Sequence, residues 1–392
     1  MNKSKIVHII TRLDTGGSAE NTIITCSLSD KSRFETTLVY GPPLIKTLSC
    51  ESVVLPSLVR EISPVKDIIT LIALFRLLRK IKPDVVHTHS SKGGVIGRWA
   101  AWLYNQTTRV QGPGSRMTKI VHTPHGHVFY GYEFGLVKTL VFRLVEIFSA
   151  FITTKLIALT QGEMKESLSA GVGKPGQWTV IHSGVDIDPA ALKPGASVRK
   201  QLGLPENALV AGTIARLEHV KGVKFLIEAA GLLSKRGMRD VYWLVVGGGK
   251  LMDVLASRAN ALGLKDRIVF AGMRDDVTEM FSSMDIYVQP SLNEGMGKTI
   301  VQACALGLPV IASRVQGIPD IIKDEETGML VPPANPEALA EKIQELINDP
   351  AKRKKLGESG RIFVNRISDG FPFFSSKRMV HLMEKLYENL LR

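Results

Sequence analysis

Short apolar runs alternate with amphipathic segments along almost the whole chain. In the first half the runs include KIVHII (5–10), DVVHTH (84–89) and KLIAL (155–159), and segments with the helical period at 66–80 and 135–152 separate them. Strands that alternate with helices in this way form a parallel sheet whose two faces the helices cover. The pattern therefore predicts an α/β fold of the doubly wound type.

A second series of the same kind begins after an irregular stretch at 183–207, which has several Pro and Gly residues and no strong periodicity. Its strand-like runs include ALVAGTI (208–214) and DIYVQP (285–290). A connector between two alternating series indicates two tandem Rossmann-like domains, which we place at 1–190 and 191–370. Ligands bind at the carboxyl ends of the strands in such folds, so the interdomain cleft is the expected active site.

The last segment, 371–392, is expected to form a separate C-terminal helix. Its apolar side chains recur at helical spacing and must be buried against another part of the protein. The N-terminal domain is one candidate, but the sequence does not decide between the two domains. The apolar stripe consists of Met379, Leu382, Met383, Leu386 and Leu390.

Composition and charge limit the classes of molecule that the protein is expected to bind. A chain of 392 residues with 44% hydrophobic and 22% charged residues is typical of a soluble globular protein with two full cores. The formal net charge of +13 favours a polyanionic partner, which can be nucleic acid, an anionic membrane surface or a phosphate-rich substrate. Nucleic acid is disfavoured because the chain has no zinc-finger spacing, RNA-binding signature or basic run interleaved with aromatic residues.

The cysteines and apolar stretches predict a cytoplasmic protein. Three scattered cysteines favour a reducing compartment, and the apolar run near the N-terminus is too short for a secretory signal. The longest apolar stretch, 134–159, contains four charged residues, which makes a membrane-spanning helix costly. For this stretch and the basic segment 66–82 the pattern favours helices packed on a sheet. The alternative is peripheral contact with the anionic inner face of the cell membrane.

Four groups of residues that could bind a ligand or take part in a reaction follow predicted strands. Gly16 and Gly17 open a helix after the first strand, where glycines let the backbone approach a ligand, although Gly-Gly also makes ordinary turns. Arg216 and Lys221 lie five residues apart between a strand and a helix. A planar guanidinium and a compact ammonium suit a diphosphate, and the alternative is a pair of solvated surface charges.

Histidines form the third group. His87 and His89 follow one predicted strand, and His122, His125 and His127 follow the next. Imidazole is the commonest metal ligand, but neither run contains an Asp or Glu to complete a hydrolase site, so we expect no metal. One ring is expected instead to donate a hydrogen bond in a phosphate or sugar site, while the others support loops.

The fourth group is NEGMGKTIVQ (293–302), which looks like the end of a nucleotide-binding P-loop. A P-loop needs a glycine five positions before Gly-Lys-Thr, and Leu292 stands there, so a kinase or ATPase is disfavoured. The segment still runs from a strand into a helix, whose N-terminus can bind an anion. Glu294 either caps the backbone N–H groups of this helix or accepts hydrogen bonds from ligand hydroxyls.

Taken in order, GGSAE, HTPHG, ARLEHVKG, VVGGG and NEGMGKTIVQACALGLPVIAS resemble the retaining glycosyltransferases of family 4, of the bacterial cell-surface polysaccharide type with GT-B architecture. The resemblance covers nearly the whole chain. It implies a hexosyl- or N-acetylhexosaminyl-transferase that binds a nucleotide diphosphate sugar, most often a UDP-sugar, with its second domain. The implied acceptor, held by the first domain, is lipid-linked or a saccharide, and no cofactor or divalent metal is required.

The resemblance also implies roles for individual residues. Arg216 and Lys221 would hold the donor diphosphate, Glu294 would hold sugar hydroxyls, and His125 would face the transferred sugar. In the mechanism usually proposed for such retaining enzymes, the departing phosphate oxygen takes the acceptor proton, so no protein base is needed. The donor-binding positions are Gly16, Gly17, Gly295, Met296, Gly297 and Gln302.

Gln302 departs from the family pattern, which has a second Glu at this position. An amide lacks the charge that strengthens hydrogen bonds to ribose hydroxyls, so donor binding is expected to be weaker. Two other functions stay open. One is a GT-B-like sugar-nucleotide epimerase, which would not share the ordered set of Arg216, Lys221 and Glu294, and the other is a catalytically impaired binding paralogue, for which Gln302 is the sequence hint.

Overall fold

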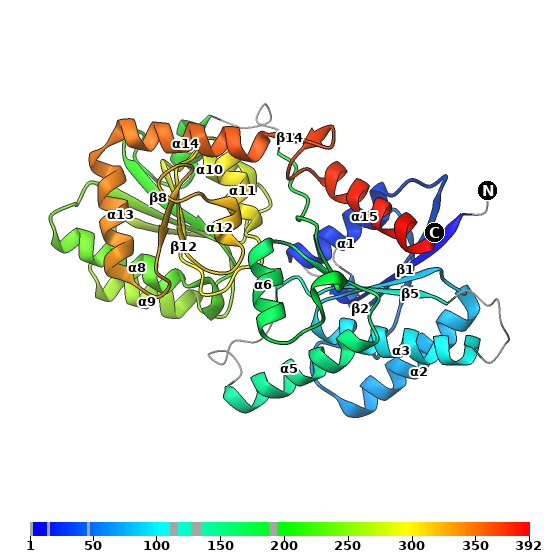
Figure 1. The fold of residues 1–392 in the computed structure, drawn as a ribbon. Helices are drawn as coiled ribbons and strands as arrows, with labels where there is room; N and C mark the ends of the chain where they lie inside the picture. The colour runs from blue at the N-terminus through cyan, green and yellow to red at the C-terminus, as the bar shows by residue number, and fades with distance from the viewer. Residues whose placement is uncertain (1–2, 14–15, 45–47, 110–116, 127–134, 188–193) are drawn as a thin grey trace. The chain divides into compact units, whose positions relative to one another are not determined.

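The chain forms two compact units in the computed structural model, which describes residues 3–13, 16–44, 48–109, 117–126, 135–187 and 194–392 (Figure 1). The first unit consists of Met1–Gly184 together with Ser375–Arg392, and the second is Val185–Phe374. The sequence placed the domain boundaries at 190 and 370, close to these divisions. Both units are parallel α/β sandwiches, as the alternation of apolar runs and amphipathic segments predicts.

The first unit is built on a seven-stranded parallel sheet with the order β3-β2-β1-β4-β5-β6-β7. β1 pairs with β2 on one side and with β4 on the other, so the strand order reverses beside β1. Such a reversal opens a crevice at the carboxyl ends of the two strands concerned. The strands are β1 (Ser4–Leu13), β2 (Phe34–Leu44), β3 (Glu51–Val54), β4 (Val85–His89), β5 (Lys119–Thr123), β6 (Lys155–Ala158) and β7 (Trp178–Val180).

Helices cover both faces of this sheet because neighbouring residues of a strand point to opposite sides. Ile6 of β1 belongs to a cluster with the last helix, and Val7 belongs to a cluster with α2 and α3. Figure 1 shows α2, α3 and α5 on one side of the sheet and α1 and α15 on the other. The helices are α1 (Gly17–Leu28), α2 (Pro64–Ile81), α3 (Ser91–Arg109), α5 (Leu136–Phe151), α6 (Gln161–Ser169) and α15 (Ser376–Leu391).

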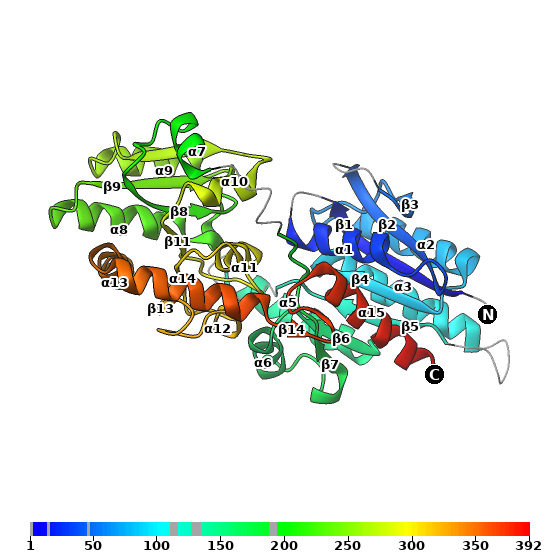
Figure 2. The same cartoon turned by 90° about the horizontal axis from the view of Figure 1, so that it is seen from above.

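The last helix, α15, packs on the first unit, beside α1 (Figure 2). Its stripe residues Met379 and Met383 are buried against Ile6, Val85 and other strand residues of the sheet. Ion pairs continue the contact at the surface, where Arg33 binds Glu384 and Glu388 at 2.5 Å each. The chain therefore closes the core of its first unit with its last 18 residues, Ser375–Arg392.

The second unit is built on a six-stranded parallel sheet with the order β10-β9-β8-β11-β12-β13, so its order reverses between β8 and β11. A core of β-branched and leucine side chains lies between the sheet and α8, α9 and α13, and Figure 2 shows α8 beside α13. The strands are β8 (Leu209–Ile214), β9 (Val241–Val246), β10 (Ile268–Gly272), β11 (Ile286–Gln289), β12 (Val310–Ser313) and β13 (Met329–Val331). The helices are α7 (Gly195–Gln201), α8 (Val223–Lys235), α9 (Met252–Ala261), α10 (Val277–Ser282), α11 (Lys298–Ala305), α12 (Ile318–Ile321), α13 (Pro336–Asn348) and α14 (Pro350–Asn365).

Some short elements were not expected from the sequence. The connector at 183–207, predicted to be irregular, contains α7, which is held because Arg199 binds the carboxylate of Asp285 at 2.8 Å. β13 and the two-residue strands β14 (Ile367–Ser368) and β15 (Phe371–Pro372) were also missed. Elements of this length carry too few residues to show a periodicity.

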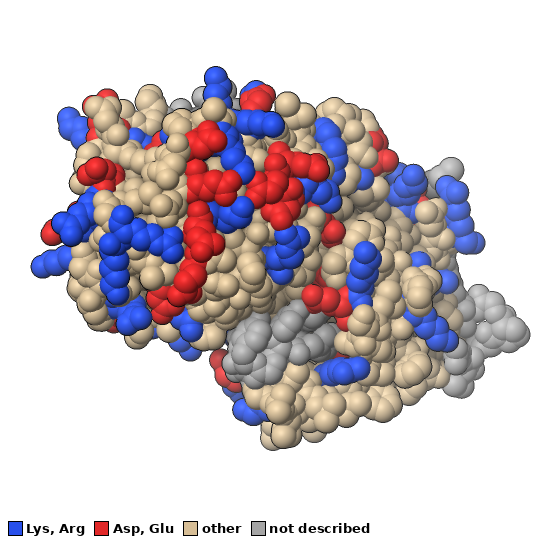
Figure 3. All heavy atoms as spheres, turned by 60° about the vertical axis from the view of Figure 1, so that its left-hand side comes forward, with Lys and Arg blue, Asp and Glu red and all other residues tan. Residues whose placement is uncertain are grey.

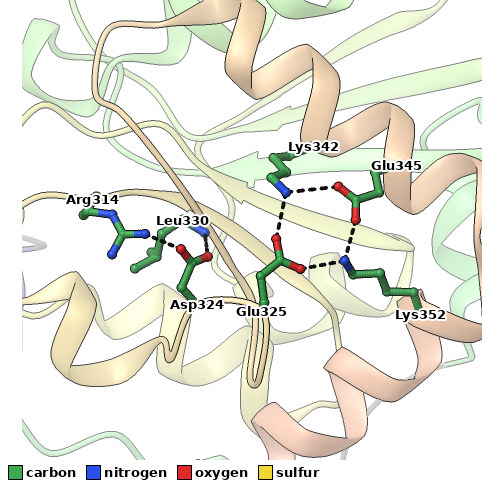
Figure 4. A network of polar contacts seen from close by, with 7 residues as sticks. All are labelled: Arg314, Asp324, Glu325, Leu330, Lys342, Glu345 and Lys352. Carbon is green, nitrogen blue, oxygen red and sulfur yellow. Dashed lines mark hydrogen bonds and ion pairs between the residues drawn. The ribbon is translucent and has the colours of Figure 1, made fainter.

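A network of ion pairs ties α13 and α14 to the turn before β13 (Figure 4). Glu325 accepts from Lys342 at 2.7 Å and from Lys352 at 2.6 Å, and Glu345 is bound by the same two lysines. The hydrogen bonds from Lys342 and Lys352 lower the pKa of Glu325, and the carboxylates raise the pKa of Lys352 to about 12. Because each pair is partly exposed, we assign the network a modest stabilising role.

The surface charge is mixed on the face that Figure 3 shows. Acidic side chains form a continuous band there, with basic side chains on both sides of it. The net charge of +13 is therefore not expressed as a uniformly positive surface on that face. Within the parts of the chain that the structure describes, none of the helices has the length and apolar character needed to cross a membrane.

Candidate functional site

The two loops that carry the predicted diphosphate and sugar ligands meet at the reversal point of the second sheet. Arg216 and Lys221 follow β8, and Glu294 follows β11. Because β8 and β11 are hydrogen-bonded neighbours that run parallel, both loops leave the same edge of the sheet. Residues that lie far apart in the sequence are thereby brought together.

Direct contacts lock these two loops to each other. The backbone N–H of Leu292 donates to the carbonyl of Val220 at 2.8 Å. Gly222 has a φ of 63°, and a Cβ at this position would lie 2.0 Å from the carbonyl oxygen of Pro290. Only glycine fits here, so Gly222 sets the distance at which the Lys221 loop approaches the loop after β11.

Lys221 and Glu294 form an ion pair with 2.6 Å between Nζ and Oε2. Both side chains are mostly buried, with 18% and 14% of their surface exposed. Oε2 of Glu294 also accepts from Nε2 of Gln289 at 3.2 Å and from the hydroxyl of Ser291 at 3.3 Å. The sequence left two roles open for Glu294, capping of the helix or binding of a ligand. In the structure the N-cap of α11 is Gly297 and not Glu294. The carboxylate of Glu294 instead contacts the side chains of Lys221, Gln289 and Ser291.

The start of α11 places a backbone turn beside this ion pair. Gly297 is the N-cap residue with φ 79° and ψ 68°, in the left-handed region where glycine is favoured. A Cβ on Gly297 would lie 3.3 Å from Cγ of Glu294. Met296 is buried and Gly295 is half-buried. Gln302 lies further along α11 and is half-buried, and Thr299 binds the side chain of Gln289 at 3.2 Å.

Arg216 is more exposed than Lys221. Its side chain is 47% exposed, and its NH1 atom lies 3.4 Å from the carboxylate of Glu218. The backbone beside it is fixed because Leu217 donates to the carbonyl of Gly248 at 2.9 Å. The structure therefore brings the Arg216 loop against the glycine-rich turn after β9, while its guanidinium stays accessible.

The other predicted ligand residues belong to the first unit. Gly16 is the N-cap of α1 and Gly17 is its first residue, so the pair opens a helix after β1 as expected. His125 follows β5 and has a φ of 59°, and Gly126 after it has a φ of 93°. Two consecutive left-handed residues make a sharp turn that is unusual for histidine. His127 lies outside the described residues.

His8, His87 and His89 form a buried polar cluster in the first sheet. His8 lies opposite His87 in the register of β1 and β4, and His89 is two residues further on the same face. His87 binds the hydroxyl of Tyr387 at 2.6 Å and that of Thr123 at 2.8 Å. Burial lowers the pKa of His87 and His89 well below the ordinary value, so both rings are neutral at physiological pH.

Nitrogen atoms of His8, His87 and His89 lie within 4.8 Å of one another, close enough to be considered as metal ligands. The sequence favoured a supporting role over a metal site. In the structure both ring nitrogens of His87 have hydroxyl partners. A metal ion would have to displace Tyr387 or Thr123 from this ring.

Glu163 is a buried residue beside the turn after His125 that sequence reasoning missed. Its side chain, at the start of α6, accepts the backbone N–H of Gly126 at 2.7 Å and that of Leu159 at 2.6 Å. A carboxylate with no exposed surface is costly unless it is hydrogen-bonded in this way. The sequence signal was faint: Thr160 and Glu163 have the spacing of a capping box, which does not reveal a bond to Gly126.

Comparisons with known proteins agree with this architecture. Residues 10–189 match the model for "Glycosyltransferase Family 4", and residues 196–363 match the model for "Glycosyl transferases group 1". An Escherichia coli UDP-Gal:alpha-D-GlcNAc-diphosphoundecaprenol alpha-1,3-galactosyltransferase is 33% identical over 338 residues, which are 84% of each chain. The capsular polysaccharide biosynthesis glycosyltransferase CapM of Staphylococcus aureus is 26% identical over 85% of this chain and 84% of its own.

Solved structures with the same fold include HepE from Anabaena, crystallised with UDP and glucose, and the lipopolysaccharide glycosyltransferase WaaG. HepE superposes with a TM-score of 0.81 at 19% identity and covers 98% of this chain and 100% of its own. WaaG superposes with a TM-score of 0.74 at 16% identity, covering 96% and 99%. These likenesses establish two GT-B domains. Together with the galactosyltransferase and the two family models, they show that this chain is a glycosyltransferase and belongs to glycosyltransferase family 4.

Proposed function

We propose that the protein is a retaining transferase that moves a hexose or N-acetylhexosamine from a UDP-sugar to a lipid-linked or saccharide acceptor in surface polysaccharide biosynthesis. The observation that carries this proposal is the arrangement of Arg216, Lys221 and Glu294 at one edge of the second sheet. The name of the E. coli relative supports it, since that enzyme uses UDP-galactose and a diphosphoundecaprenol-linked acceptor.

The ion pair between Lys221 and Glu294 suits this reaction. When a diphosphate leaves an anomeric carbon, negative charge grows on the phosphate and positive charge on the sugar. We propose that Lys221 and Arg216 stabilise the phosphate, while Glu294 holds sugar hydroxyls. With two cations after β8, we propose that transfer requires neither a divalent metal nor another cofactor. The backbone of Gly295, Met296 and Gly297 would then contact the donor.

The proposal for the first unit is that Gly16 and Gly17 approach the diphosphate and that His125 faces the transferred sugar. The start of α1 offers backbone N–H groups, and its two glycines carry no side chain that would block an anion. His125 is held at the end of β5 by the turn described above. These roles follow from family membership and are consistent with the local geometry.

Transfer is tested by incubating the protein with UDP-galactose, UDP-glucose and UDP-N-acetylglucosamine, with and without a polyprenyl-diphosphate-linked sugar. We expect one donor to release UDP only when the acceptor is present, together with a lipid-linked product whose new linkage keeps the α configuration. Interconversion of UDP-sugars without acceptor would identify an epimerase instead. Failure to bind or consume any donor would support the impaired paralogue.

Gln302→Glu is expected to lower the KM for the donor about fivefold, because a charged acceptor strengthens a hydrogen bond to a ribose hydroxyl by about 1 kcal/mol. The side chain is half-buried on α11, so it can reach a ligand without unfolding the helix. Steady-state kinetics with varied donor measure the change. Gln344→Glu is a matched control, because Gln344 lies on α13 and binds Arg236, the C-cap residue of α8, and not the donor site. Identical donor KM and kcat values in Gln302→Glu and the parent would rule out a ribose contact at this position.

Contact with an anionic membrane is proposed for the exposed face of the helical layer that contains α2 and α5, which lie on the same side of the first sheet (Figure 1). Both helices pack on the sheet, as the sequence favours, yet both leave large apolar side chains in water: Leu136 on α5 is 84% exposed and Val65 on α2 is 70% exposed. Basic residues lie among them, which is the composition of an interfacial helix. The apolar residues of this face are Val65, Ile68, Ile69, Ile72, Leu136, Val137, Leu140, Val141, Leu144, Phe148 and Phe151, and the basic ones are Lys66, Arg76, Arg79, Lys80, Lys138 and Arg143.

Phe148→Glu is expected to weaken vesicle binding about tenfold, since burying one aromatic side chain contributes about 1.5–3 kcal/mol and a charge there is repelled. Co-sedimentation with phosphatidylcholine vesicles containing phosphatidylglycerol measures the binding. Ile362→Glu is the control, because Ile362 is 65% exposed on α14 of the second unit. Equal loss in both variants, or equal binding to neutral vesicles, would contradict the proposal that this face meets an anionic bilayer.

A further inference from the structure

The side chain of Gln289, the last residue of β11, lies at the centre of a buried hydrogen-bond network beside Glu294. Its Oε1 atom accepts from the hydroxyl of Tyr287 and, at 3.2 Å, from that of Thr299. Its Nε2 atom donates to the hydroxyl of Ser291 at 2.8 Å and to Oε2 of Glu294 at 3.2 Å. Gln289 is 1% exposed, so solvent water has little access to these contacts.

The charge on Glu294 decides which way the amide of Gln289 points. The oxygen and the nitrogen of a glutamine amide are similar in shape, so their positions follow from their partners. Oε2 of Glu294 lies 2.6 Å from Nζ of Lys221 in an ion pair, and the oxygen of an ionised carboxylate only accepts hydrogen bonds. With the amide turned round, two acceptor oxygens would face each other at 3.2 Å. Nε2 must therefore lie on the side of Glu294.

The hydroxyl groups around the amide agree with this direction. Burial raises the pKa of Tyr287, so its hydroxyl keeps its hydrogen at neutral pH and donates it to Oε1. The hydroxyl of Thr299, in the first turn of α11, is a second donor to the same oxygen. Ser291 accepts from Gln289 and gives its one hydrogen to Oε2 of Glu294 at 3.3 Å. Both hydrogens and both lone pairs of the amide thus have a partner.

The two oxygens of Glu294 have different surroundings. Oε2 has three donors, which are the ammonium of Lys221, the amide of Gln289 and the hydroxyl of Ser291. Oε1 accepts from no group in the described parts of the chain, and it is not fully buried. Because a carboxylate oxygen has about two lone pairs, Oε2 has no capacity left for a ligand hydroxyl, whereas Oε1 has both of its own.

We propose that Gln289 is a positioning residue for Glu294, and that Oε1 of Glu294 is the atom that accepts hydrogen bonds from hydroxyls of the donor sugar. Gln289, Ser291 and Lys221 hold Oε2, so the carboxylate does not rotate to exchange its two oxygens. Because Gln289 also binds Thr299, it ties this carboxylate to the first turn of α11. The contact with the sugar rests on the proposed function, whereas the direction of the amide and the fixed carboxylate do not.

NMR of the full chain labelled with 15N in its glutamine side chains tests the hydrogen bonds of Gln289 without any substrate. The sequence has nine glutamines, so the signals of Gln289 are assigned as the pair that disappears in Gln289→Met. We expect both of its Nε2 hydrogens to exchange with solvent about 100-fold more slowly than those of Gln201, which is exposed. Equal exchange rates at the two side chains would overturn the network.

Gln289→Met separates positioning of Glu294 from general damage. The introduced side chain is unbranched and of similar length, but it cannot donate to a carboxylate. We expect kcat to fall about 10- to 100-fold because the carboxylate is free to turn, while the Kd for UDP, which lacks the transferred sugar, stays within about twofold. Gln344→Met is the matched control and is expected to change neither value, since Gln344 binds Arg236. Loss of UDP binding in parallel with kcat would leave Gln289 with a structural role only and refute the proposal.

Donor analogues that lack one sugar hydroxyl at a time test the role of Oε1 of Glu294. In the unmodified protein we expect one analogue to have a kcat/KM at least about tenfold below that of the complete donor. In Gln289→Met the same comparison is expected to differ by less than about threefold, because the hydroxyl has already lost its acceptor. Equal losses in the two proteins would mean that Gln289 and the hydroxyl act independently, and would rule out positioning through Glu294.

Failure of this inference can be told from failure of the proposed function. If the unmodified protein transfers no sugar but the amide of Gln289 is protected from exchange, the function fails and the network stands. If Gln289→Met does not fold, Gln289→Glu takes its place, since the introduced carboxyl keeps an oxygen for Tyr287 and Thr299. We expect kcat to fall at least about tenfold in Gln289→Glu, because two adjacent carboxylates repel each other and Glu294 turns. An unchanged kcat in this variant would refute the positioning role.

Discussion

Lys221→Ala is expected to lower kcat/KM for sugar transfer by about 10²- to 10³-fold, the loss typical of removing one preorganised charge donor from a transition state. The ammonium group is well placed for this role. It is mostly buried, it is anchored 2.6 Å from Glu294, and its loop is locked by the contact between Gly222 and Pro290. Because the ammonium group is already held in place, it needs little reorganisation when negative charge develops on the departing phosphate. Nucleotide release and product formation at varied donor concentration measure the effect.

Substitutions of two neighbouring basic residues, Arg216 and Lys224, are compared with Lys221→Ala. Arg216→Ala is expected to have an effect of the same order, because a guanidinium can bind a phosphate through two N–H groups. Lys224→Ala is the matched control: Lys224 is an exposed lysine on α8 that lies over the ring of Phe225, and its loss is expected to leave kcat/KM within about twofold. Near-parent activity in both Lys221→Ala and Arg216→Ala would rule out the proposed diphosphate-binding site at this edge of the sheet.

Much of the second unit could be predicted from sequence because its proposed site residues lie within short continuous motifs. Arg216 and Lys221 are five residues apart, and Glu294 begins the turn into α11. The predicted order of strand, turn and helix is therefore enough to place these residues at strand ends. The sequence could not show that Lys221 and Glu294 form an ion pair. That contact depends on β8 and β11 being neighbours, which follows from the strand order and not from any local pattern.

The first unit was harder to predict in detail. The two histidine runs are visible in the sequence, whereas His8 stands alone within the apolar run KIVHII (5–10). Its place beside His87 and His89 depends on the register between β1 and β4, which are far apart in the sequence. Likewise, α15 was recognised as an amphipathic helix, but an apolar stripe does not specify its partner, and Tyr387 reaches His87 only because α15 packs on this sheet.

The ion pair between Arg98 and Glu146 leads to the largest expected effect on stability. Arg98 on α3 has no exposed surface, and its NH2 atom lies 2.7 Å from Oε2 of Glu146 on α5. Its Nε atom donates to the carbonyl of Gly94 at 2.9 Å. Glu146→Ala removes the carboxylate and leaves a buried guanidinium without its counter-ion. We therefore expect the free energy of unfolding of the first unit to fall by about 3–5 kcal/mol.

Urea unfolding followed by tryptophan fluorescence measures this loss, because Trp99, Trp102 and Trp178 all lie in the first unit. Glu358→Ala is the control: Glu358 forms an ion pair with Arg361 in which both side chains are about half exposed, and we expect no shift of the unfolding midpoint. The double substitution Arg98→Met with Glu146→Leu is expected to recover most of the stability, because it removes both buried charges together. If Glu146→Ala were as stable as Glu358→Ala, the guanidinium of Arg98 would have to be neutralised or hydrated by other groups, and α5 would not depend on this pair for its attachment to α3.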